Sequence, residues 1–164
     1  MSCYQGQTAI RPTFYHAERP VRAAGILLWT KYDNRTMWLL NKCHHNFEDL
    51  GGKTDVCDRT PLDTAIREAC EETNNSIFSN KHTFKECADM LYEHAIESMD
   101  VQYNDRSKYL LFRVHVHPSI LSLDMRRFGR TEKTEWGVLQ HYFQWWWKKP
   151  FHNQLHPRLR GLEL

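Results

Sequence analysis

Three glutamates, Glu68, Glu71 and Glu72, are spaced so that one turn of a helix would bring their carboxylates together. Like charges at such spacings repel each other, and a divalent cation would neutralise the repulsion. Mg²⁺ and Mn²⁺ prefer oxygen ligands of this kind. The alternative is a solvated acidic helix face, which is the ordinary interpretation of an isolated Glu-x-x-Glu-Glu segment. The residues upstream of the triplet favour the metal site.

Two adjacent glycines, Gly51 and Gly52, precede the glutamates, and Lys53 follows them directly. Adjacent glycines permit a tight backbone turn with accessible carbonyls and amides. Such groups could bind a metal or contact a phosphate. Lys53 is therefore a candidate for contact with substrate phosphate, and Arg22 is a second candidate.

The segment that carries the glutamates is predicted to be a helix from about Pro61 to Thr73. Thr60 is a suitable N-cap, and Pro61 suits the first helical position. Asn74 with Asn75 provides a left-handed stop. An apolar stripe with helical spacing would face a core; it consists of Leu62, Ala65, Ile66, Ala69 and Cys70.

Strands and further helices are predicted around this helix. Residues 21–30 indicate a buried strand, with residues 37–42 as its hairpin partner across the turn at residues 32–35. Residues 108–116 and 136–139 indicate later strands. Helices are predicted over three other segments, at residues 83–98, with a strand as the alternative, and at residues 140–148 and 156–163.

This order of elements predicts an α/β (α+β) fold, an α/β/α sandwich with a central mixed sheet. The length of 164 residues favours one domain. Residues 1–20 have no sustained hydrophobic period and are interpreted as an N-terminal arm. The single domain is then expected over residues 21–164.

Composition excludes several classes of protein. The 22 basic and 20 acidic residues give a net charge of +2, which is no strong electrostatic signal for nucleic acid or an acidic membrane. No apolar run is long enough for a membrane helix. The five cysteines are scattered without a Cys-x-x-Cys pair, which favours reduced thiols and a cytoplasmic location.

Gly52, five residues, Asp58, eight residues and the run Arg67-Glu68-Ala69-Cys70-Glu71-Glu72 together resemble the Nudix box of the Nudix hydrolase superfamily. The family's pattern has Glu at the position of Asp58 and one residue fewer before Arg67. It closes with Gly and an aliphatic residue where Asn74 and Asn75 stand. In the family the upstream acid pairs with the arginine, so the resemblance makes Asp58 and Arg67 structural partners. Residues 48–55 look closest to divergent members, including some from large DNA viruses.

The resemblance implies a Mg²⁺-dependent pyrophosphohydrolase, with Mn²⁺ as an alternative cofactor. Such an enzyme cleaves a phosphoanhydride bond of a nucleoside diphosphate-linked substrate by attack of water. The resemblance also implies that Glu71 and Glu72 are the main metal ligands and that Glu68 is a ligand or the base. Gly51 or Gly52 would supply a backbone carbonyl.

Many members of the family take a general base from a distant loop, and Glu132 and Glu135 are the candidates here. Each could equally be an exposed loop acid. Cys43 with His44 and His45 could bind a soft metal, although adjacent histidines on a loop are more often surface residues.

The substrate stays open between a damaged nucleoside triphosphate, a nucleotide sugar or dinucleotide polyphosphate, a diphosphoinositol and capped RNA. A function of another class is a nucleotide-sensing module that has lost turnover. The run Trp145-Trp146-Trp147 could stack on a base, but core packing or a homodimer interface is the more usual role of such residues.

Overall fold

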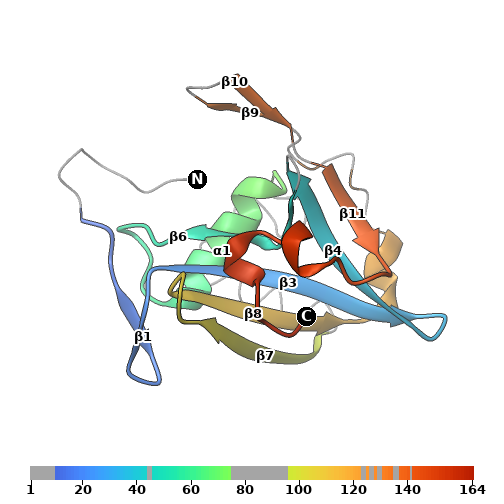
Figure 1. Cartoon of the computed structure of the whole chain (residues 1–164), viewed down its shortest axis with the longest axis horizontal. Coiled ribbons are helices and arrows are strands. Elements are labelled where there is room, and N and C mark those ends of the chain that lie inside the picture. Colours follow the sequence, from blue (N-terminus) through green and yellow to red (C-terminus); the bar gives the residue numbers. More distant parts are fainter. Residues whose placement is uncertain are drawn as a thin grey trace.

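A mixed β-sheet forms the centre of the molecule (Figure 1). The computed structural model describes residues 10–43, 46–74, 96–122, 125, 128, 131–134, 137–140 and 142–164. The strands of the sheet are β3 (Ala23–Tyr32), β4 (Arg35–Cys43), β5 (Asn46–Glu48), β6 (Leu50–Lys53), β7 (Ile96–Asn104), β8 (Tyr109–Val116) and β11 (Tyr142–Trp146). The order is β11-β4-β3-β8-β7, with β5 paired to β4 and β6 paired to β3. Only β3 and β8 are parallel among these pairs, so the predicted mixed sheet is confirmed.

The predicted helix is confirmed as α1 (Pro61–Glu72). The Thr60 hydroxyl accepts a hydrogen bond from the backbone N–H of Asp63, and the Asp63 carboxylate accepts one from the N–H of Thr60. This reciprocal cap satisfies two backbone donors at the start of the helix. Asn74, just beyond the end, has a φ of 52°, which is the left-handed stop that its sequence position predicted.

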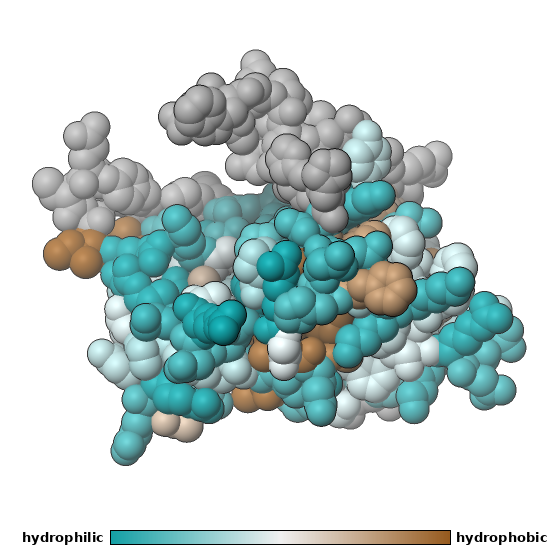
Figure 2. Space-filling view, viewed as in Figure 1, coloured by the Kyte–Doolittle hydropathy of each residue, from teal (hydrophilic) through white to brown (hydrophobic). Residues whose placement is uncertain are grey.

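The two faces of the sheet are covered by different parts of the chain (Figure 1). Successive residues of a strand point to opposite faces. Ala24, Ile26 and Leu28 of β3 therefore pack with α1, whereas Leu27 packs with the C-terminal segment. That segment contains the short 3₁₀ helices η3 (His152–Gln154) and η4 (Pro157–Leu159). The outer surface on this side is largely hydrophilic, with scattered apolar patches (Figure 2).

The helix predicted over residues 156–163 is wrong. The backbone N–H groups of Leu159, Arg160 and Leu162 each bond to the carbonyl three residues earlier, so the segment turns as 3₁₀ helix. Leu159 is fully buried on the sheet. Docking of a few apolar side chains, rather than a long amphipathic helix, therefore covers this face.

The helix predicted over residues 140–148 is also wrong, because these residues form the edge strand β11. Trp145 and Trp146 point to opposite faces of the sheet: Trp145 is 8% exposed on the α1 side, and Trp146 packs edge-on against Phe47 with ring centroids 4.6 Å apart. Trp147 is exposed. The expectation of core packing is confirmed for Trp145. The helix was predicted wrongly because aromatic residues have a high propensity for strands, and this segment is rich in them.

Outside the central sheet, β1 (Phe14–His16) and β2 (Arg19–Val21) form a hairpin within the predicted N-terminal arm. Phe14 packs against the core on the α1 side. A 3₁₀ helix, η1 (Pro118–Ser122), follows β8, and β9 (Thr131–Thr134) pairs with β10 (Gly137–Gln140). The helix predicted over residues 83–98 lies mostly outside the described residues, and the chain is in strand β7 from Ile96. The division of the chain at residue 20 stays a prediction.

Two further findings concern the cysteines and the helices. Cys57 is disulfide-bonded, so the expectation that all five cysteines are reduced is wrong at this residue. Spacing along the chain could not show which cysteines the fold brings together. The cytoplasmic location therefore loses the support of fully reduced thiols. Across the described ranges, no helix has the length and apolarity needed to cross a membrane.

Replacing Leu159 by Ala tests the packing of the C-terminal segment. Leu159 is 0% exposed, so we expect Leu159→Ala to lower the free energy of unfolding by about 2–5 kcal/mol. Urea denaturation followed by tryptophan fluorescence measures the change. Phe151→Ala is the matched control, because Phe151 lies in the same segment and is 75% exposed. Equal losses in the two variants would contradict the packing.

Candidate functional site

A buried ion pair joins α1 to the loop before it. The Nε of Arg67 donates to Oδ1 of Asp58 at 3.0 Å, and its Nη2 donates to Oδ2 at 3.1 Å. The side chain of Asp58 is 0% exposed and that of Arg67 is 3% exposed. Nη2 of Arg67 also donates to the carbonyl of Lys53 at 2.7 Å. The extra residue between Asp58 and Arg67 thus does not prevent the predicted pairing.

Asp58 also organises its own loop. Its carboxylate accepts hydrogen bonds from the backbone N–H of Asp55 and from the hydroxyl of Thr64, both at 2.8 Å. The ion pair and its neighbours together raise the pKa of Arg67 despite its burial, so this residue stays a cation. Arg67 therefore fixes the end of β6 to the helix that carries the glutamates.

Glu68 lies against the glycines of β6. A Cβ atom on Gly52 would lie 2.5 Å from the carboxyl carbon of Glu68, so no larger residue fits without moving that carboxylate. Its Oε1 accepts a hydrogen bond from Nη1 of Arg67 at 3.1 Å. Burial raises the pKa of Glu68 to about 7, with Arg67 opposing the change and Glu71 adding to it.

Glu71 and Glu72 complete the predicted triplet in two different environments. Glu71 lies within 3.4 Å of Nη1 of Arg67. Oε2 of Glu72 accepts a hydrogen bond from the backbone N–H of Gly51 at 3.2 Å. Burial raises the pKa of Glu72 well above its usual range, and other carboxylates nearby add to the effect. Glu68 and Glu72 therefore lie against the glycines of β6, whereas the Glu71 side chain contacts Arg67 and is 27% exposed.

A second charged network approaches from the opposite face of the sheet. Nε of Arg158 donates to Oδ1 of Asp49 at 2.9 Å, and Tyr109 donates its hydroxyl hydrogen to Oδ2 of Asp49 at 2.5 Å. Asp49 is fully buried. Glu48 lies 3.9 Å from Nη2 of Arg158. The Arg158 guanidinium also opposes the increase in the pKa of Glu72, so the two networks interact electrostatically.

These residues escaped prediction because their association depends on the fold. Asp49 and Arg158 are 109 positions apart. The approach of Tyr109 also explains Gly51, since a Cβ there would lie 2.0 Å from the tyrosine hydroxyl oxygen. Nothing in the sequence indicated that Asp49 and Arg158 are partners.

The chemistry of the glutamate triplet suits a hard divalent cation. All its side-chain donors are oxygens, and burial raises the pKa of Glu68 and Glu72 because it removes the water that stabilises their charge. In the described part of the chain, no three His, Cys, Asp or Glu side chains already converge as metal ligands. Glu68 and Glu71 contact Arg67, while Glu72 contacts Gly51. Cation binding therefore requires these side chains to exchange those contacts for the metal.

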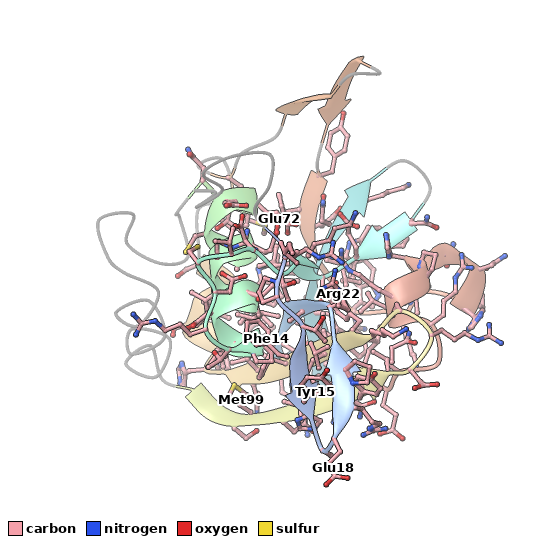
Figure 3. The ribbon with its side chains drawn as sticks, turned by 90° about the vertical axis from the view of Figure 1, so that its left-hand side faces the viewer. Phe14, Tyr15, Glu18, Arg22, Glu72 and Met99 are labelled. Carbon is pink, nitrogen blue, oxygen red and sulfur yellow. The ribbon has the colours of Figure 1, made fainter. Side chains whose placement is uncertain are left out.

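The two predicted substrate residues lie in different places. Lys53, at the end of β6, is exposed. Arg22 instead holds the chain before β1, because its Nη1 donates to the carbonyls of Arg11 and Pro12 and to the hydroxyl of Thr13. The Arg22 side chain is therefore held by the N-terminal segment, and its contact with substrate stays a prediction. Figure 3 shows Arg22 beside the β1–β2 hairpin, below Glu72, which lies at the end of α1.

Several predicted residues fall outside the described structure. Glu132 lies in β9, but its side chain is not among those described, and Glu135 is outside the described residues. His44 and His45 are outside them as well. Their suggested roles stay predictions.

Comparison with known proteins gives weak similarities only. No protein-family model matches the chain, and no curated protein matches it. A crystal structure of a C. elegans Ap4A hydrolase binary complex aligns at 19% identity over 58% of this chain and 66% of that one, with a TM-score of 0.38. A crystal structure of C. elegans Ap4A hydrolase aligns at 19% identity over 63% of this chain and 74% of that one, with a TM-score of 0.40. The NUDIX domain of Shewanella oneidensis NrtR complexed with ADP ribose aligns at 15% identity over 77% of this chain and 71% of that one, with a TM-score of 0.39. The functional argument therefore rests on the chain's own residues.

Removing the charge of Asp58 tests the pair that fixes the helix. Asp58→Asn leaves Arg67 buried without its carboxylate, and we expect a loss of about 3–5 kcal/mol in the free energy of unfolding. Chemical denaturation measures this loss. Asp33→Asn is the matched control, because Asp33 is exposed in the β3–β4 turn and its φ of 53° suits Asn. A loss below about 1 kcal/mol in Asp58→Asn would be inconsistent with a buried ion pair.

Proposed function

We propose that the chain is a Nudix hydrolase, a Mg²⁺-dependent pyrophosphohydrolase acting on a nucleoside diphosphate-linked substrate. One observation carries the proposal: Arg67 joins the Asp58 loop and the end of β6 to α1, and α1 presents Glu68 and Glu72 to Gly51 and Gly52. The residues that resemble the Nudix box thus form one connected unit, although they are separated in sequence.

In this proposal Glu71 and Glu72 hold the metal, with Glu68 as a further ligand or as the base. The carbonyl of Gly51 or Gly52 is an additional ligand. When bound, the cation supplies charge neutralisation for the diphosphate and activates water. A solvated acidic face is less consistent with the burial of Glu68, whose side chain is 17% exposed.

The remaining residues position these groups. Nε and Nη2 of Arg67 are taken up by Asp58 and the Lys53 carbonyl, so Arg67 acts as a positioning residue and not as a phosphate clamp. The exposed ammonium of Lys53 is available to a substrate phosphate. Attack of water on one phosphorus breaks the P–O–P bridge, and the water oxygen stays in one of the two phosphorylated products.

In the alternative function, the protein keeps the same fold and binds a nucleotide without hydrolysing it. The clustered carboxylates weigh against it, because burying several like charges destabilises a protein and serves no purpose in binding an anionic nucleotide. Cytoplasmic location, homodimer formation and the choice of substrate, capped RNA included, stay predictions that the described residues do not decide.

A substrate screen tests the proposed activity. The full chain is incubated with Mg²⁺, Mn²⁺ or EDTA and with a nucleoside triphosphate, a dinucleoside polyphosphate, a nucleotide sugar, a diphosphoinositol or capped RNA. We expect metal-dependent release of phosphorylated products from one class, and EDTA should abolish it. Tight binding of one ligand without hydrolysis of any would favour the sensor instead.

On the substrate found, Glu71→Gln and Glu72→Gln should each lower kcat by about 10²-fold or more, because each removes a charged ligand. Glu18→Gln is the matched control, since Glu18 is exposed at the tip of the β1–β2 hairpin, far from Glu72 in Figure 3. Circular dichroism checks that each variant is folded. Full activity in folded Glu71→Gln and Glu72→Gln would refute the metal role.

A further inference from the structure

A cavity of about 570 Å³ lies between the β7–β8 turn and the C-terminal segment. Asn104, Arg106 and Ser107 line it on one side, and the C-terminal segment lines the other. Because that segment covers the sheet face opposite α1, the cavity is separate from the glutamate triplet. The volume falls within the range of small-molecule sites.

Asn104 holds the two walls of the cavity together. Its Oδ1 accepts hydrogen bonds from the backbone N–H groups of Arg106 at 3.1 Å and Ser107 at 3.4 Å. Its Nδ2 donates to the carbonyls of Arg158 at 2.9 Å and Arg160 at 3.3 Å. Asn104 is 8% exposed, and these four bonds use the full capacity of its amide. The positions of the walls are therefore fixed.

The side chains around the cavity are cationic or neutral. Arg106, Arg160 and His152 line it, and no carboxylate does. Nε of Arg160 donates to the carbonyl of Leu155 at 3.0 Å, which orients the guanidinium. Among the described residues, neither Arg106 nor Arg160 forms an ion pair with a carboxylate.

His156, in the same segment, is affected by burial and by the neighbouring arginines. The pKa of His156 is lowered, first by burial and then by Arg158, with Arg160 adding to the effect and Asp49 opposing it. Two arginines that share a cavity without a carboxylate repel each other, and an anion between them relieves the repulsion.

We propose that this cavity binds a phosphomonoester. Arg106 and Arg160 hold the dianionic phosphate, because the planar guanidinium offers paired N–H donors that match phosphate oxygens. Ser107 lies beside them, and the remaining volume takes the organic group that carries the phosphate. The inference does not rest on the proposed hydrolase activity, since none of these residues belongs to the glutamate site.

Calorimetric titration of the full chain tests the proposal. The probes are inorganic phosphate and a nucleoside monophosphate, with EDTA present throughout and the ionic strength held constant. EDTA matters because the glutamate triplet repels phosphate when no cation is bound there. We expect both probes to bind and the nucleoside monophosphate to bind more tightly.

Arg106→Gln is the decisive variant, because the hydrogen bond that ties Arg106 to Asn104 uses its backbone N–H and survives the change. We expect this variant to bind both probes about tenfold or more weakly, which is the loss that follows removal of a charge-assisted hydrogen bond. Arg160→Gln should act in the same way, and Arg160→Lys should restore part of the affinity. Arg35→Gln, at an exposed arginine that begins β4, should leave affinity unchanged.

Three results would overturn the proposal. The first is no binding of either probe, and the second is equal weakening in Arg106→Gln and Arg35→Gln, which indicates non-specific attraction by net charge. The third is equal affinity for both probes, which would leave an inorganic phosphate site and remove the organic group from the proposal. An unchanged melting temperature in Arg106→Gln verifies that the cavity persists in that variant.

Discussion

The candidate site depends on one buried contact, the ion pair between Arg67 and Asp58. Arg67 stands at the centre of the helix that carries the glutamates, and its guanidinium reaches the Asp58 loop, the carbonyl of Lys53 and two of those glutamates. A buried cation with one partner is costly, but here several acceptors surround it. Because one rigid side chain contacts all of them, the relative positions of loop, strand and helix are set together.

Charged side chains reach the region of β6 from both faces of the sheet. α1 brings Glu68 and Glu72 to one side of β6, and the C-terminal segment brings Arg158 to Asp49 on the other. Gly51 and Gly52 allow this convergence, since side chains there would collide with Tyr109 and Glu68 respectively. The paired glycines therefore serve close approach on both faces at once, which is a stronger constraint than the tight turn that the sequence suggested.

Local signals predicted the parts of the fold that local physics determines. The cap at Thr60, the apolar stripe of α1 and the β3–β4 hairpin were all found from periodicity and turn chemistry. The helices expected over residues 140–148 and 156–163 failed, because a short apolar run takes its conformation from the sheet against which it packs. The glutamates were found because they are close in sequence. Asp49 and Arg158 were not, because only tertiary structure brings them together.

The Asp58 carboxylate shows how a short loop holds a helix in place. Asp58 lies three positions before the first residue of α1, close enough for its side chain to reach into the helix. The carboxylate then meets Arg67 with two hydrogen bonds at 3.0 and 3.1 Å and still reaches Thr64 within α1. A single buried aspartate therefore joins the loop to α1 at two positions, Thr64 and Arg67, and this fixes the loop on the helix.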